Sequence, residues 1–305
     1  MKESNYLKVM ERSIADWKQL SEQYSTLAPT MGWNNFRKEH LHYDDFIQFT
    51  EVDFTFLREL ADINLSRATF MECQLHDLFI ANANFEQAHF EKCNLQKTDF
   101  TDSDMHHVVF DSCKMTEINC ARVNLTGSII RASDLTKSGF GEANCTGTKL
   151  NLSTLVKSSL AEVKFTKAKI QKCDLKEANL TNSVFLESNI QKSIFHKTRF
   201  IDAIISNSTI KSSNFSNSNF RRAVIRKTRF EDIHFNHSFF NNAIFQDVTF
   251  NTTDFTKARL RKTSFINCRF NHVIGLDQII QKGECYFDSI SEQALKDELR
   301  KLEVG

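Results

Sequence analysis

The residues best able to do chemistry in this chain are its eight cysteines and ten histidines. Cys73, Cys93 and Cys113 recur at a constant interval, and Cys173 falls in the same series. No two cysteines have the C-x-x-C spacing typical of zinc or redox sites, so neither chemistry is predicted. Two interpretations stay open: adjacent thiols close enough for a disulfide, or small apolar side chains that fill a core. We favour core filling.

Within the repeats the histidines form only two close sets, His106 with His107 and His234 with His237. Neither set is accompanied by a series of cysteines or carboxylates that would complete a ligand shell. The chain also lacks a glycine-rich phosphate loop, a G-x-S-x-G motif and an H-E-x-x-H motif. The sequence therefore predicts no catalytic residue, no metal site and no cofactor, and it favours a protein that is not an enzyme.

Charge is balanced overall but distributed unevenly. The chain has 39 basic and 38 acidic residues, whereas residues 181–270 alone have 14 basic and 6 acidic ones. This surplus has two interpretations: a solvated face partly balanced by nearby acids, or a patch for an acidic protein, a nucleic acid or an anionic membrane surface. Its main clusters are Arg221, Arg222, Arg226, Lys227, Arg229 and Arg259, Arg261, Lys262, Arg269.

A repeat of five residues must position all of these side chains. Every fifth residue from Leu60 to Phe270 is Leu, Phe, Ile, Met or Cys, and the residue two before it is usually small. A period of five matches neither the 3.6 of a helix nor the 2 of a strand. We infer a square coil with five residues per side and 20 per turn. Successive coils then stack like parallel strands, about 4.8 Å apart.

Units such as Ala83-Asn84-Phe85-Glu86-Gln87 resemble the pentapeptide-repeat family. The resemblance implies an all-β solenoid, a right-handed quadrilateral β-helix of about 11 coils. In resembling bacterial proteins the C-terminal end often forms a two-fold homodimer. The best-known activity in the family is protection of DNA gyrase or topoisomerase IV by mimicry of duplex DNA, which requires an acidic surface.

We expect three segments: an N-terminal helical cap (1–45), the β-helix (46–273) and a C-terminal helical cap or dimerisation segment (274–305). Apolar spacing predicts helices over residues 5–25 and 289–302. One extra residue between Phe54 and Leu60 predicts a bulge in the first coil. Residues 271–288 read as irregular. The candidate dimer or cap residues are Ile290, Leu295, Leu299 and Leu302.

One outward column changes character along the chain. The residue before each centre is polar from Asn64 to Lys164 at 20-residue steps, then β-branched for four coils. Strand propensity explains this change, and so does an exposed apolar stripe used for contact. Because the stripe shares coils with the basic surplus, we predict a binding face there. It comprises Val184, Ile204, Val224, Ile244, Leu186, Ile201, Arg221, Arg222, Arg226 and Lys227.

These observations favour a non-enzymatic scaffold that binds a protein partner, such as a bacterial effector or regulator. The alternative is a DNA mimic that protects or inhibits gyrase or topoisomerase IV, although the chain has no acidic excess. A binder of nucleic acid or of an anionic membrane is a third possibility. No apolar run approaches the roughly 20 residues of a membrane span, and no signal segment follows Met1. We expect a cytoplasmic protein, with secretion as an effector without a cleaved signal left open.

Overall fold

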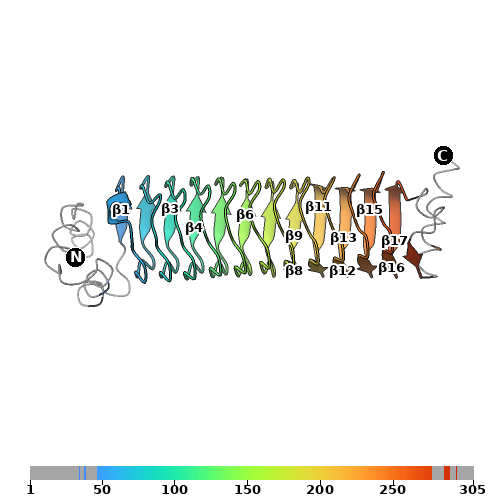
Figure 1. The fold of residues 1–305 in the computed structure, drawn as a ribbon, viewed down its shortest axis with the longest axis horizontal. Coiled ribbons are helices and arrows are strands. Elements are labelled where there is room, and N and C mark those ends of the chain that lie inside the picture. Colours follow the sequence, from blue (N-terminus) through green and yellow to red (C-terminus); the bar gives the residue numbers. More distant parts are fainter. Residues whose placement is uncertain (1–33, 35–37, 39–46, 277–284, 289–292, 294–305) are drawn as a thin grey trace, which may run out of the picture. The chain divides into compact units, whose positions relative to one another are not determined.

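The structure is a computed structural model that describes residues 34, 38, 47–276, 285–288 and 293. The helix predicted over residues 5–25 and nearly all of the one predicted over 289–302 lie outside these residues. The chain divides into two compact units, residues 1–144 and 145–305, and we describe each by itself. Within each unit the described chain winds as stacked β-coils, so the predicted β-solenoid is confirmed (Figure 1). No helix among the described residues is long and apolar enough to span a bilayer.

Unit 1 has one strand per coil along one wall. These strands pair in parallel, in chain order (Figure 1). A single turn of 3-10 helix, η1 (Thr55–Leu57), lies in the first described coil. The strands are β1 (Gln48–Thr50), β2 (Thr69–Met71), β3 (His89–Glu91), β4 (Val109–Asp111) and β5 (Ile129–Arg131).

Unit 2 has a comparable wall, whose last four strands extend around a corner to six residues each. They are β6 (Lys149–Asn151), β7 (Lys169–Gln171), β9 (Asn189–Gln191), β11 (Thr209–Asn214), β13 (Arg229–His234), β15 (Thr249–Asp254) and β17 (Arg269–Ile274). A second parallel sheet forms another wall. It contains β8 (Val184–Leu186), β10 (Ile204–Ser206), β12 (Val224–Arg226), β14 (Ile244–Gln246), β16 (Ser264–Ile266) and β18 (Tyr286–Phe287).

The pairing register confirms the predicted coil length and locates the inserted residue. Phe70 pairs with Phe90, which is the spacing of four repeats, whereas Phe49 pairs with Phe70, which is one position more. Pairing returns to the spacing of four repeats at Glu59 with Phe79. The predicted insertion is therefore real. The predicted bulge is corrected to η1, where the chain absorbs the extra residue in a tight turn that ends at Arg58 with φ of 54°.

The repeat centres stack as columns of apolar side chains. In unit 2 the rings of Phe195 and Phe215 are parallel, with centroids 4.6 Å apart and an interplanar angle of 2°. Phe235 and Phe255 continue the column at centroid distances of 5.5 and 5.3 Å. All four side chains are at most 1% exposed. Each ring is therefore held by dispersion contacts with the coils before and after it.

The small residues also point inward, and their hydroxyl groups find backbone partners there. Ser128 Oγ donates to the carbonyl of Met105 at 2.8 Å, and Ser238 Oγ donates to that of Phe215 at 2.7 Å. Both serines are fully buried. Because an unpaired buried hydroxyl would be costly, this bond explains why serine and threonine are accepted as readily as alanine.

The coil turns its corners at the residue two after each centre. This residue has a positive φ in every repeat from Asp62 to His272. For a residue other than glycine, that conformation costs about 1–2 kcal/mol. The backbone N–H exposed at the corner recovers part of this cost by bonding the next coil, as Arg67 N donates to the carbonyl of Glu86 at 2.7 Å. Asn and Asp adopt this conformation more readily than other non-glycine residues, and together they occupy 12 of the 43 corners, whereas lysine occupies 11.

Residues from outside the repeats contact the first and the last of the described coils. Asn34 Nδ2 donates to the carbonyl of Asp62, and Asn34 Oδ1 accepts from the N–H of Asn64, both at 2.9 Å. At the other end, β18 pairs with β16, and Phe287 stacks on Phe265 at 4.9 Å. The expectation that residues 271–288 are irregular is wrong for the end of β17 and for β18. The segment boundaries at 45/46 and 273/274 stay predictions.

We predict that Phe215→Ala lowers the free energy of unfolding by about 3–5 kcal/mol, because the cavity interrupts a column of stacked rings. The measurement is urea unfolding followed by circular dichroism. Phe239→Ala is the matched control, since Phe239 is an outward-facing, half-buried residue, and its loss is expected to be much smaller. Equal losses in both variants would contradict the register.

Corner strain gives a second prediction. Leu152 has a φ of 54° and is 57% exposed. Leu152→Asn therefore removes backbone strain without removing core contacts, and we expect the free energy of unfolding to rise by up to about 1 kcal/mol.

Gly275 has a φ of 83°, and a Cβ there would lie 2.4 Å from Thr256 N. Gly275→Ala should therefore lower stability, since that neighbour is backbone and has little freedom to shift. Thermal melting of both variants checks the pair; a stabilised Gly275→Ala would refute the argument.

Candidate functional site

The four β-branched residues of the predicted face lie side by side in unit 2. Val184, Ile204, Val224 and Ile244 are the first residues of β8, β10, β12 and β14, which pair in that order. Ile204 is 45% exposed, and the other three are half-buried. They form a continuous apolar line on the outside of one wall. We call residues 183–187, 203–207, 223–227 and 243–247 the stripe wall.

Local structure changes where this column changes from polar to β-branched. In unit 1 the Asn84 side chain accepts a hydrogen bond from the backbone N–H of Glu86 at 2.9 Å, and Asn124 does the same for Thr126 at 3.2 Å. Such side-chain bonds favour a turn at this position. Valine and isoleucine cannot make them, and their branched Cβ suits an extended strand. The corresponding residues of unit 2 accordingly form a sheet.

The other predicted residues border this line on both sides. Leu186 and Arg226 end β8 and β12, and both pair with Ser206. Lys227 follows at the corner with a φ of 46°. On the opposite side Ile201, Arg221 and Arg222 lie at the preceding corner. The register therefore brings all ten predicted residues to one wall and its two edges, whereas their role in binding stays a prediction.

Charges at these edges are only partly compensated. Arg222 Nε donates to Asp202 Oδ1 at 2.7 Å, and this hydrogen bond lowers the pKa of Asp202. Arg221, Arg226 and Lys227 have no carboxylate within ion-pair distance among the described residues. An apolar line between two cationic edges suits a partner that is apolar in the middle and acidic at its borders.

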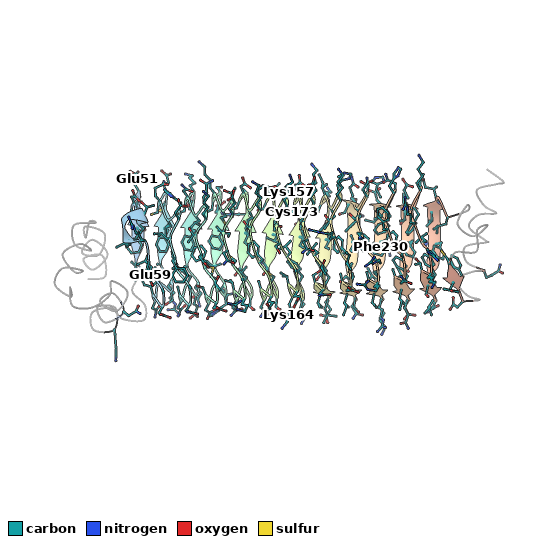
Figure 2. All side chains as sticks on the ribbon, in the orientation of Figure 1. Glu51, Glu59, Lys157, Lys164, Cys173 and Phe230 are labelled. Atoms are coloured by element: carbon teal, nitrogen blue, oxygen red, sulfur yellow. The ribbon has the colours of Figure 1, made fainter. Side chains whose placement is uncertain are left out.

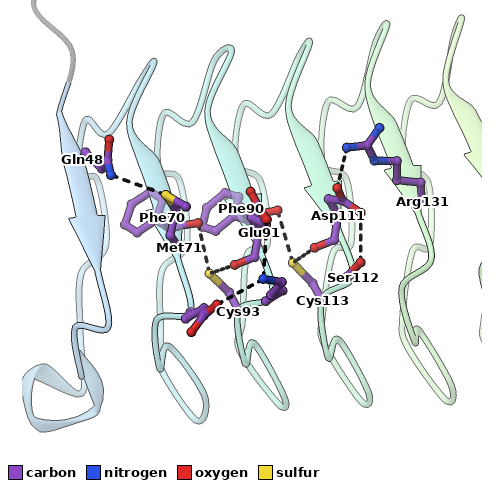
Figure 3. Close-up of polar contacts among 12 residues, drawn as sticks. Gln48, Phe70, Met71, Phe90, Glu91, Cys93, Asp111, Ser112, Cys113 and Arg131 are labelled. Atoms are coloured by element: carbon purple, nitrogen blue, oxygen red, sulfur yellow. Dashed lines mark hydrogen bonds and ion pairs between the residues drawn. The ribbon is translucent and has the colours of Figure 1, made fainter.

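The cysteine series forms an inward column in unit 1. The thiols of Cys93 and Cys113 point to backbone carbonyls of Phe70 and Phe90, each at 3.4 Å (Figure 3). No disulfide joins Cys73, Cys93 and Cys113. The neighbouring Cys113 thiol, together with burial, raises the pKa of Cys93 to about 12. The Cys93 thiol is therefore a protonated core side chain, poorly suited to nucleophilic chemistry or metal binding.

Two further cysteines behave in the same way in unit 2. Burial raises the pKa of Cys145 to about 12 and that of Cys173 to about 11. Charged side chains occupy the outside instead, as Lys164 illustrates (Figure 2). Across the described residues, no group of three or more His, Cys, Asp or Glu side chains is placed to hold a metal ion.

His106 lies between two carboxylates in unit 1. Its Nδ1 lies 2.8 Å from Asp104 Oδ1, and its Nε2 lies 3.1 Å from Glu86 Oε1. The hydrogen bond to Asp104 raises the pKa of His106, and the charge of Glu86 adds to the effect. This cluster explains a local preference for the imidazolium form and requires no ligand.

Two family models of the same repeat match the sequence of this chain. Residues 46–120 match "Pentapeptide repeat region", and residues 103–140, 138–176, 170–207, 203–242 and 235–271 match "Pentapeptide repeats (8 copies)". These matches cover most of the chain. The chain belongs to the pentapeptide repeat family, as the resemblance indicated.

Two solved structures that resemble this chain share little sequence with it. HetL, a pentapeptide repeat protein involved in heterocyst differentiation regulation in Nostoc sp. strain PCC 7120, is 13% identical. Its match covers 75% of this chain and 93% of HetL, with a TM-score of 0.37. QnrB1, a plasmid-mediated fluoroquinolone resistance protein, is 12% identical over 77% of this chain and 98% of its own, with a TM-score of 0.30. A search of curated proteins found no match.

Some predicted residues cannot be placed on the site. Ile290, Leu295, Leu299 and Leu302 lie outside the described residues, so the predicted C-terminal homodimer stays a prediction. Conversely, the face predicted from the sequence did not include Arg199 and Phe239, which point outward in unit 2. A signal was available, because both occupy the same column at 20-residue spacing as Arg259.

We predict that the His106 cluster makes stability depend on pH. Because the folded pKa of His106 is raised, its contribution is fully present below the unfolded pKa and is lost as pH rises through the folded value. The free energy of unfolding should therefore fall slightly above neutrality, by under about 1 kcal/mol. Urea unfolding at several pH values measures this.

His106→Gln should remove this part of the pH dependence. The matched control is His196→Gln, since His196 bonds to Ser216 and not to a carboxylate. Should His106→Gln and the unchanged protein show the same pH dependence, the assignment to His106 would be wrong.

Proposed function

We propose that this chain is a non-enzymatic scaffold that binds a protein partner through the stripe wall. The observation that supports this proposal is the line of Val184, Ile204, Val224 and Ile244 along consecutive paired strands. In the other coils and walls, the residue that directly precedes a repeat centre is mostly polar. Exposed apolar side chains that are contiguous and rimmed by charge are typical of protein interfaces.

Charge selects the kind of partner. Arg221 and Arg226 border the line on opposite sides and have no carboxylate within ion-pair distance among the described residues. We therefore propose as occupant a protein segment with apolar side chains at its centre and acidic side chains at its margins. Apolar contact would provide affinity, and the cationic edges would select orientation and raise the association rate.

A DNA mimic is the weaker alternative for this chain. Mimicry of phosphates requires a row of acidic side chains. Residues 181–270 instead have 14 basic against 6 acidic residues. The description of QnrB1 as a fluoroquinolone resistance protein belongs to that protein and, at 12% identity, carries no function to this chain. Unchanged quinolone inhibition of gyrase in the presence of this chain is the expected result.

Site-specific crosslinking tests the proposal. A photoreactive amino acid at Ser206, which lies between Leu186 and Arg226 in the sheet, should crosslink to one protein in cells. The double variant Ile204→Lys and Val224→Lys should lose this product, because it places charge in the apolar line. The crosslinked peptide of the partner should combine apolar and acidic residues.

The matched control is Thr209→Lys with Thr249→Lys, which adds the same charge on the wall formed by β11 and β15. It should keep the product, and all variants should melt like the unchanged protein. Loss of the crosslink in both double variants, or in neither, would refute the stripe wall as the interface.

A further inference from the structure

The basic surplus of unit 2 is concentrated on the wall that precedes the stripe wall in each coil. We call residues 196–202, 216–222, 236–242 and 256–262 the basic wall. Asp202 is the one acidic residue in these four segments. Their lysines and arginines are all exposed: Lys197, Arg199, Arg221, Arg222, Lys257, Arg259, Arg261 and Lys262.

The backbone ladder fixes these side chains in four parallel columns. Arg199, Asn219, Phe239 and Arg259 form successive bridges along the middle of the wall. At one corner, Arg222 N donates to the carbonyl of Asn241 at 3.1 Å, which connects neighbouring coils. The same bonding continues to Arg261 in the next coil. Cationic side chains therefore recur along a rigid surface at multiples of about 4.8 Å.

Acidic residues are fewer relative to the cations on the basic wall than on the neighbouring walls. On the wall of β11 and β13, Lys211 Nζ lies 2.6 Å from Glu231 Oε1, one coil away. The stripe wall has two cations and two acids. On the basic wall, among the described residues, only Arg222 has a carboxylate partner, Asp202. Unbalanced positive formal charge is therefore concentrated on this wall.

An aromatic ring lies among the cations. Phe239 points outward from the middle column and is half-buried, and Arg259 Cζ lies 5.1 Å from its ring centroid. Asn219 precedes it in the same column, and the buried Oδ1 of Asn241 has no hydrogen-bond partner within the described structure. Cations, an accessible ring and amides together match the phosphates, faces and edges of unpaired nucleotides.

We propose that the basic wall binds single-stranded nucleic acid. The exposed cations contact phosphates along the strand, and a base stacks on Phe239 beside Arg259. A duplex fits less well, because its bases are already stacked and cannot lie on the ring. This inference does not depend on the stripe wall, which faces a different side of the coil.

Fluorescence anisotropy with a labelled, mixed-sequence oligonucleotide of about 20 nucleotides tests the proposal. Binding should weaken with salt: about five phosphate contacts give a log–log slope near −3.5, roughly a hundredfold loss from about 50 to about 200 mM salt. A duplex of equal length should bind at least about fivefold more weakly.

Two variants separate the basic wall from charge in general. Arg199→Glu with Arg259→Glu should weaken binding at least about tenfold. Arg226→Glu with Lys227→Glu changes net charge equally on the stripe wall and should stay within about twofold. Phe239→Ala should weaken single-strand binding at least about fivefold and leave duplex binding unchanged. Thermal melting confirms that each variant is folded.

The proposal would be overturned by no oligonucleotide binding at low salt, or by equal losses of binding in both charge variants. Equal affinity for polyglutamate, with no effect of Phe239→Ala, would overturn it in favour of an acidic protein. Binding only to phosphatidylserine vesicles would overturn it in favour of a membrane surface. Failure here leaves the stripe-wall crosslink intact. Loss of that crosslink alone would likewise leave this proposal standing.

Discussion

The hydrogen-bond ladder between coils is the interaction on which everything else in this protein depends. Each coil satisfies most of its backbone by pairing with the coils before and after it, as Phe85 N does with the carbonyl of Asp104 at 2.7 Å. The ladder tolerates no drift, because a one-residue shift would turn the repeat centres outward. The single extra residue near Phe54 is accordingly confined to η1, and normal register resumes at Glu59.

The ladder also decides how side chains can serve function. Repeat centres and the small residues before them are buried, so cysteines such as Cys93 lose their reactivity to burial and to neighbouring thiols. Outward positions are free to vary, and each is repeated at a fixed spacing. A surface built this way acquires properties by column: apolar along Val184 to Ile244, and cationic along Arg199 to Arg259. Binding through walls follows naturally from such a construction.

Neighbouring walls of one unit can therefore differ sharply. The stripe wall has an apolar line and equal numbers of cations and acids, whereas the basic wall has Asp202 as its one acid. Arg222 lies at their shared corner and pairs with Asp202. Independent ligands on adjacent walls are compatible with a rigid scaffold, because no rearrangement of the coil is needed to expose either surface.

The sequence by itself determined the coil, its register, the inward columns and the place of the insertion, because strict periodicity leaves one way to bury every fifth side chain. It also placed Ile204 and Val224 in one column. Only the tertiary structure decided that β18 rejoins the sheet and that η1 replaces a bulge. These features depend on contacts between coils and at their ends, where no period of five constrains the chain.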